Sequence, residues 1–167
     1  FQSMKANVNK SYIPIIQEIS KIIEDCRLFN IESSKQYSSL LSFLDEGNQE
    51  LNVEIRCEGH TDDAILPPQS DYRNNWELSS ARSLRVVQIM NDASTISEKY
   101  FSYNGYGEFR PLINVAGIDD FQKKKQARAY NRRVEIYLDA FARPKTRSSE
   151  DEFLKMLKNK FKKDEKP

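Results

Sequence analysis

The stretch Asn52–Asp63, with the sequence NVEIRCEGHTDD, decides the fold. In its first part apolar and charged residues alternate, and the apolar set is Val53, Ile55 and Cys57. Such alternation is typical of a strand that buries one face and exposes the other. The pattern predicts a strand over residues 52–59. The polar run Gly59–Asp62 follows directly, so we expect its side chains at the tip of that strand.

A helical pattern follows this strand after a loop over residues 62–74, which contains Pro67-Pro68. It begins at Asn75 and reaches about Ala93. Apolar residues recur there at spacings of three and predict the buried face: Leu78, Ala81, Leu84, Val87 and Met90. The same type of pattern predicts an amphipathic helix over residues 12–26.

The segment 28–50 has two interpretations. Four apolar residues, Tyr37, Leu40, Leu41 and Leu44, indicate a short helix that Gly47-Asn48 would end. Alternatively, residues 28–31 form a short strand.

The second half of the chain predicts two further strands. They cover residues 100–106 and 133–138, and the second would turn Val134, Ile136 and Leu138 inward. Residues 110–128 between them are interpreted as a long loop with a solvated basic run at 123–125. The tail from Ala142 is polar and then weakly amphipathic, which indicates a peripheral helix or a frayed end. This order of elements predicts an α+β fold with helices on one face of a small mixed sheet.

The bulk composition limits the function. Hydrophobic residues make up 38% of the 167, enough for one core, while the net charge of +1 gives no general attraction to nucleic acid or anionic membranes. Cys26 and Cys57 are interpreted as two separate thiols. No apolar run approaches the ~20 residues of a membrane span. Residues 1–4 are expected to be the remnant of a tag-removal site and are set apart from the domain.

Opposite charges stand at the predicted strand tip and helix start. Asp62 could hold an ammonium group, whereas Arg82 offers a planar fork for a carboxylate. A helix beginning near Asn75 also presents free N–H groups and a positive dipole end, which favour a carboxylate. An acid and a base on facing walls of a cleft would suit a zwitterionic amino-acid moiety. From the residues alone, an ordinary ion pair between Asp62 and Arg82 explains the pattern equally well.

Four motifs in this order resemble the OmpA-like peptidoglycan-binding family. They are GHTD at 59–62, NWELSSAR at 75–82, GYGEFRP at 105–111 and NRRVEI at 131–136. The sequence of residues 75–79 is most similar to that of the MotB-like branch, which anchors ion-driven stator complexes to the wall. The resemblance implies a β-α-β-α-β-β fold in which Asp62 and Arg82 clamp the diaminopimelate of the wall peptide.

The resemblance also implies supporting residues and domain limits. Asn75 and Arg132 would assist the clamp, and Thr61 and Ser79 would shape the pocket. The family's first strand would lie in truncated form at residues 4–8, or at residues 28–31. We expect the domain to cover residues 5–141 with an insertion at 28–50, followed by a tail at 142–167.

We therefore expect a non-catalytic peptidoglycan anchor in the periplasm or cell envelope, with no cofactor and no metal. A homodimer is possible, and a membrane partner would bind through a region outside this chain. The machine it anchors could be a flagellar stator, a defence system or an outer-membrane tether. Alternatives are a wall hydrolase using Asp62 and Asp63, or a degenerate domain that binds a protein partner. His60, the only histidine, is interpreted as structural rather than as a metal ligand.

Overall fold

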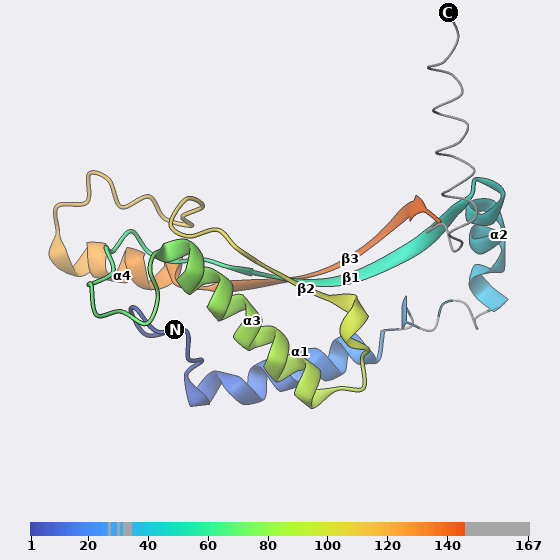
Figure 1. Ribbon diagram of the computed structural model, residues 1–167, viewed down its shortest axis with the longest axis horizontal. Coiled ribbons are helices and arrows are strands. Elements are labelled where there is room, and N and C mark those ends of the chain that lie inside the picture. Colours follow the sequence, from blue (N-terminus) through green and yellow to red (C-terminus); the bar gives the residue numbers. More distant parts are fainter. Residues whose placement is uncertain (27, 30, 32–34, 146–167) are drawn as a thin grey trace, which may run out of the picture. The chain divides into compact units, whose positions relative to one another are not determined.

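The computed structural model of this chain describes residues 1–26, 28–29, 31 and 35–145 (Figure 1). The chain divides into two compact units, one of residues 1–33 and 53–140, and one of residues 34–52 and 141–167. The first unit contains all the predicted site residues. None of the described helices has the length and apolar character needed to cross a membrane.

The sheet has three strands in the described residues. They are β1 (Gln49–Gly59), β2 (Phe101–Gly105) and β3 (Val134–Pro144), in the order β2-β1-β3. β1 and β2 are parallel, with Gly59 opposite Gly105. The His60 N–H donates to the Arg133 carbonyl at 2.9 Å, so the end of β1 meets the start of β3 and these strands are antiparallel. The predicted mixed sheet is confirmed.

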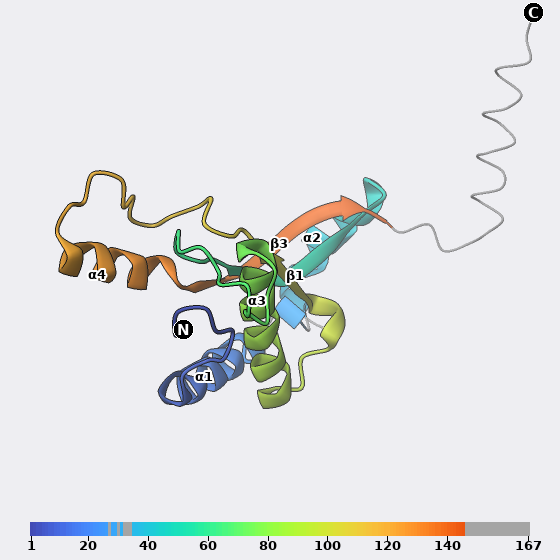
Figure 2. The same cartoon turned by 60° about the vertical axis from the view of Figure 1, so that its left-hand side comes forward.

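Two helices, α1 (Ile13–Glu24) and α3 (Asn75–Ala93), contact each other and cover one face of this sheet (Figures 1 and 2). Asn74 caps α3, because its side chain accepts a hydrogen bond from the Glu77 N–H at 2.9 Å. The core that the helices and the sheet enclose consists of Ile16, Ile23, Ile55, Cys57, Val86, Ile89, Met90 and Ile96. Burial raises the pKa of the Cys57 thiol to about 12, and both cysteines are free.

The buried face of α3 differs from the predicted one. Leu78 and Met90 are buried as expected, but Ala81, Leu84 and Val87 are only partly buried. The residues buried instead are Ser79, Arg82, Ser83, Val86 and Ile89. The serines are buried because α3 packs closely against two glycines. A Cβ on Gly59 would lie 1.9 Å from the Ser79 carbonyl oxygen, and one on Gly105 would lie 2.3 Å from the Ser80 hydroxyl. Small residues on this face let the helix backbone approach the strand ends.

Neither predicted position for a first strand is correct. Residues 4–8 form no strand, and the described residues of 28–31, namely Leu28, Phe29 and Ile31, lie in 3-10 turns. Phe29 packs edge-to-face on Tyr100, with 5.1 Å between ring centroids. The segment therefore serves core packing rather than strand pairing. In the described part of the chain the order is β-α-β-α-β after the N-terminal helices.

The prediction of a loop over residues 110–128 is wrong in its second half. Helix α4 spans Phe121–Asn131 and is capped by Asp120, whose side chain accepts from the Lys123 N–H at 2.7 Å. Only Ala127 and Asn131 are buried, so the helix has no apolar stripe that the sequence could reveal. The predicted last strand also continues to Pro144.

The second unit contains helix α2 (Ser38–Glu46) and the adjoining ends of β1 and β3. This confirms the predicted short helix, which buries Leu44 and has Gly47 as its C-cap. Ion pairs join Arg143 to Glu50 at 2.8 Å and Lys145 to Asp45. Most of the predicted polar tail, residues 146–167, lies outside the described residues.

Candidate functional site

The predicted site residues come together at one end of the first unit. Gly59 ends β1 and residues 60–62 follow it, the segment from Asn75 to Arg82 begins α3, and Arg132 follows α4. Backbone hydrogen bonds of 2.9 Å join the Thr61 N–H to the Gly107 carbonyl and the Tyr106 N–H to the Gly59 carbonyl. These bonds join the motif at residues 59–62 to the motif at residues 105–111.

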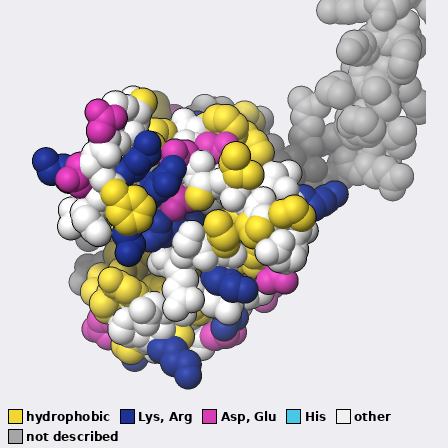
Figure 3. All heavy atoms as spheres, turned by 90° about the vertical axis from the view of Figure 1, so that its left-hand side faces the viewer, with side chains coloured by type: hydrophobic (Ala, Val, Ile, Leu, Met, Phe, Trp, Pro, Cys, Tyr) yellow, Lys and Arg dark blue, Asp and Glu magenta, His cyan; other side chains and the backbone are white. Residues whose placement is uncertain are grey.

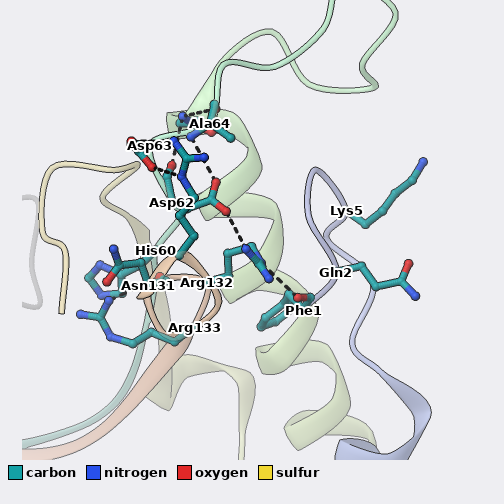
Figure 4. A network of polar contacts seen from close by, with 12 residues as sticks. Phe1, Gln2, Lys5, His60, Asp62, Asp63, Ala64, Asn131, Arg132 and Arg133 are labelled. Atoms are coloured by element: carbon teal, nitrogen blue, oxygen red, sulfur yellow. Dashed lines mark hydrogen bonds and ion pairs between the residues drawn. The ribbon is translucent and has the colours of Figure 1, made fainter. Parts of the chain in front are cut away.

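Asp62 is held between two donors. One carboxylate oxygen accepts from the Arg132 guanidinium at 2.7 Å, and the other accepts from the Ala64 N–H at 3.2 Å (Figure 4). The Asp62 side chain is only 7% exposed, and that of Arg132 is 17% exposed. Asn75 donates to the Ala64 carbonyl at 3.2 Å, so it fixes the loop that carries Asp62. The fourth motif thus supplies the ion-pair partner of the first.

Arg82 is fully buried, and its guanidinium is capped by backbone carbonyls. It donates at 3.0 Å to the carbonyls of His60, Gln2 and Lys5. The Phe1 ring lies 5.2 Å from its central carbon. Burial lowers the pKa of Arg82 to about 10, while nearby Asp62 acts in the opposite direction. Within the described residues no carboxylate forms an ion pair with Arg82, so its direct hydrogen-bond partners are neutral backbone carbonyls.

Residues 1–5 therefore lie where the sequence analysis expects an open wall of the cleft. The Phe1 carbonyl also accepts weakly from Arg132 at 3.4 Å (Figure 4). Asp62 and Arg82 are near each other, but the structure places Arg82 beneath the N-terminal segment. The sequence gives no sign of this cover, because the contacts use backbone carbonyls, which every residue type carries.

Thr61 and Ser79 are buried behind the carboxylate rather than exposed to a guest. The Ser79 hydroxyl donates to the Trp76 carbonyl and accepts from the Gly107 N–H, both at 2.9 Å. It therefore ties the start of α3 to the loop after β2. The Thr61 hydroxyl has no hydrogen-bond partner in the described part of the chain.

A cavity of about 310 Å³ opens beside Asp62 and Arg132. Its other lining residues are Ser3, Ala64, Phe121, Lys124, Lys125 and Arg128. Figure 3 shows Lys and Arg side chains gathered on the face that carries α4. Sequence reasoning missed the contribution of Lys124 and Lys125 because it assigned them to a loop. Their spacing to Arg128, four and three residues, is the signal that a helical interpretation would have used.

Both carboxylates of the predicted alternative hydrolase are held by arginines. Arg128 binds Asp63 through two bonds of 2.7 and 3.0 Å, and this contact lowers the pKa of the Asp63 carboxyl. Arg132 binds Asp62 through one bond of 2.7 Å. A general acid needs a carboxyl whose pKa is raised, so this arrangement suits charge recognition better than proton transfer.

His60 is buried, and its ring stacks on Tyr106 with 5.5 Å between centroids. Neither ring nitrogen has a hydrogen-bond partner among the described residues. Glu58, His60 and Glu135 could offer three metal-ligand atoms within 4.8 Å of one another. However, Arg56 already binds Glu58 and Arg133 binds Glu135, so a metal ion would meet two guanidinium groups.

Burial, followed by the charge of Arg133, lowers the pKa of His60 below its usual 6.5. Below pH 6.5 the unfolded chain therefore binds a proton that the folded protein resists. We expect the free energy of unfolding to fall as the pH is lowered from 7 to 5.5, by at most about 1.4 kcal/mol per pH unit. Urea titrations at several pH values give this free energy for the wild type and for His60→Gln. We expect it to depend less steeply on pH in the variant. An equal dependence on pH in the two proteins would contradict this role, because the Phe1 amino group, whose pKa burial also lowers, is present in both.

A model of the OmpA family matches residues 29–132, more than half of the chain. The chain is 27% identical to Motility protein B of Bacillus subtilis over 138 residues, which are 83% of this chain and 41% of that protein. It is 33% identical to the uncharacterized protein YtxE of the same organism over 90 residues, 54% of this chain and 34% of that protein. The chain thus spans less than half the length of both relatives.

Solved structures share the fold. The periplasmic domain of Helicobacter pylori MotB has a TM-score of 0.57 at 21% identity, with 96% of this chain and 76% of that one covered. The peptidoglycan-associated lipoprotein from Burkholderia pseudomallei has a TM-score of 0.51 at 16% identity, with 83% and 86% covered. At these identities the likeness concerns the fold alone.

Proposed function

Since the chain belongs to the OmpA family, we propose that it binds peptidoglycan through the diaminopimelate of the peptide stem, and does so without catalysis. The observation that carries this proposal is the charge arrangement at the end of β1. A buried carboxylate, Asp62, lines a 310 Å³ cavity. The buried Arg82, which has no carboxylate partner in the described residues, lies near it beneath residues 1–5. Diaminopimelate ends in an ammonium and a carboxylate on one carbon, which matches both charges.

Each predicted residue has a role in this proposal. Asp62 accepts from the ammonium group, and Arg132, already bonded to it, keeps the carboxylate oriented. Arg82 receives the guest carboxylate once the carbonyls of Gln2 and Lys5 have left it. Asn75, Thr61 and Ser79 hold the loop and strand end in place from behind.

The wider role is also a proposal. Similarity to Motility protein B favours a wall anchor in the cell envelope that tethers a stator-like membrane complex. The membrane partner would bind a region outside this chain. Two copies would strengthen retention, because binding of the second becomes intramolecular once the first has bound.

Cosedimentation with purified sacculi tests the proposal. We expect retention of the wild type, competition by soluble muropeptides that contain diaminopimelate, and at least about tenfold weaker competition by muropeptides that contain lysine, which lacks the second carboxylate. Chromatography of the muropeptides should show no new product. Absence of retention, or equal competition by both peptides, would contradict diaminopimelate recognition. Release of a product would favour the hydrolase.

Deletion of residues 1–5 should tighten muropeptide binding by roughly three- to tenfold. A carboxylate on Arg82 would then replace solvent rather than two protein carbonyls, and charge-assisted bonds are about twice as strong as neutral ones. The matched control is Gln2→Ala/Lys5→Ala, which keeps both backbone carbonyls and should bind like the wild type. Titration calorimetry gives the dissociation constants. A deletion variant that stays folded but binds no better would show that Arg82 is not the carboxylate partner.

A further inference from the structure

Helix α4 brings an unexpected set of cations to the cavity beside Asp62. Lys124, Lys125 and Arg128 line it together with Arg132, so four cationic side chains share the space with one lining carboxylate. The face of the molecule that carries α4 shows this concentration of Lys and Arg (Figure 3). The resemblance to the OmpA-like family assigns no ligand role to these α4 residues.

The four cations are not equivalent. Arg128 is bound to Asp63 and Arg132 to Asp62, so two of the charges are already balanced. Lys124 and Lys125 form no ion pair with any residue in the described ranges. The cavity therefore retains a positive charge, and apolar surface of Phe121 and Ala64 lies within the same lining. Such a lining favours a guest that brings a further anion attached to a carbon chain.

We propose that Lys124, Lys125 and Arg128 form a second anion subsite that takes another carboxylate of the same stem peptide. This inference rests on the proposed function, since Asp62 would hold the ammonium of diaminopimelate at one side of the cavity. The shared chemistry is a carboxylate, which the stem offers at the D-glutamate α-carbon and at the C-terminus. A phosphate polymer fits less well, because its repeated charges would also meet Asp62 and Asp63.

The chain offers a matched control for this subsite. Lys123 lies on the same helix and is exposed, but it does not line the cavity. Lys124→Ala/Lys125→Ala should weaken binding of the tripeptide L-alanyl-γ-D-glutamyl-diaminopimelate by about tenfold at low salt, whereas Lys123→Ala should change it by no more than about twofold. The difference should shrink as salt is added, because exposed charges are screened. Circular dichroism checks that the variants are folded.

Two amidated peptides identify the carboxylate. One carries an amide at the D-glutamate α-carboxyl and the other at the C-terminus. For the wild type, one of them should bind about tenfold more weakly than the free tripeptide, and the double variant should lose that discrimination. The inference is overturned if the double variant binds like the wild type or weakens binding of all three peptides equally.

Failure of this inference is distinguishable from failure of the proposed function. If the tripeptide binds, and its binding is weakened by Asp62→Asn but not by Lys124→Ala/Lys125→Ala, only the proposal of a second subsite fails. If the wild type binds neither the tripeptide nor sacculi, both proposals fall.

Discussion

A Gly59→Ala variant is expected to lose at least about 3 kcal/mol of its free energy of unfolding, which is a large part of the stability of a domain of this size. Gly59 is the last residue of β1, and a Cβ built there lies 1.9 Å from the Ser79 carbonyl oxygen and 2.8 Å from the Ser79 carbonyl carbon. Both atoms belong to the backbone of α3. The overlap cannot be relieved by a rotamer change, so the helix must move away from the sheet.

Such a movement would disturb the site as well as the core. Arg82 lies three residues beyond Ser79 and donates to the His60 carbonyl, next to Gly59. Displacing α3 would therefore lengthen the contact that fixes the end of β1. We expect the variant to bind muropeptides weakly even where some folded protein remains.

Urea unfolding of Gly59→Ala and Gly47→Ala measures this effect. Gly47 is the matched control, because its Cβ would meet no atom closer than 3.5 Å and its φ of −79° suits alanine. The control should stay within about 0.5 kcal/mol of the wild type. A Gly59→Ala protein as stable as Gly47→Ala would mean that α3 and β1 are less tightly packed than described.

The sequence predicts those elements whose residues follow a regular apolar pattern along the chain. Alternation at Val53, Ile55 and Cys57 identified β1, and apolar periodicity identified α3. The buried face of α3 was misplaced because periodicity counts apolar residues, whereas here close approach to Gly59 selects serines. Helix α4 was missed because it is polar on nearly every side and is stabilised by its cap and by contacts such as Arg128 with Asp63.

The sequence predicts which residues belong to the candidate site better than it predicts how they contact one another. Sequence motifs selected Asp62 and Arg132, which the structure joins at 2.7 Å, but they did not predict this pairing. The expected open face of Arg82 is instead covered by residues 1–5, through carbonyl groups that carry no sequence signature. Lys124 and Lys125 line the cavity because their segment forms helix α4. Long-range placement of this kind depends on tertiary contacts, which single-sequence patterns do not contain.

An Asp62→Asn variant is expected to bind muropeptides at least about thirtyfold more weakly, a loss of roughly 2 kcal/mol. The substitution keeps the shape of the side chain, and its oxygen can still accept from the Ala64 N–H. It removes the charge that would hold the ammonium group, and it leaves the mostly buried Arg132 without its carboxylate. We therefore also expect a moderate loss of stability, about 2 kcal/mol, visible in thermal unfolding.

Asp63→Asn separates recognition at Asp62 from a general need for acidic residues in this loop. Asp63 is the adjacent carboxylate, its side chain is 41% exposed, and Arg128 already holds it. Its replacement should weaken binding by no more than about threefold, because only the positioning of Arg128 changes. Titration calorimetry with one muropeptide, at a temperature where both variants are folded, compares them directly. Equal losses of affinity in the two variants would contradict the assignment of Asp62 as the ammonium-binding residue, since the buried carboxylate should contribute far more to binding than its exposed neighbour.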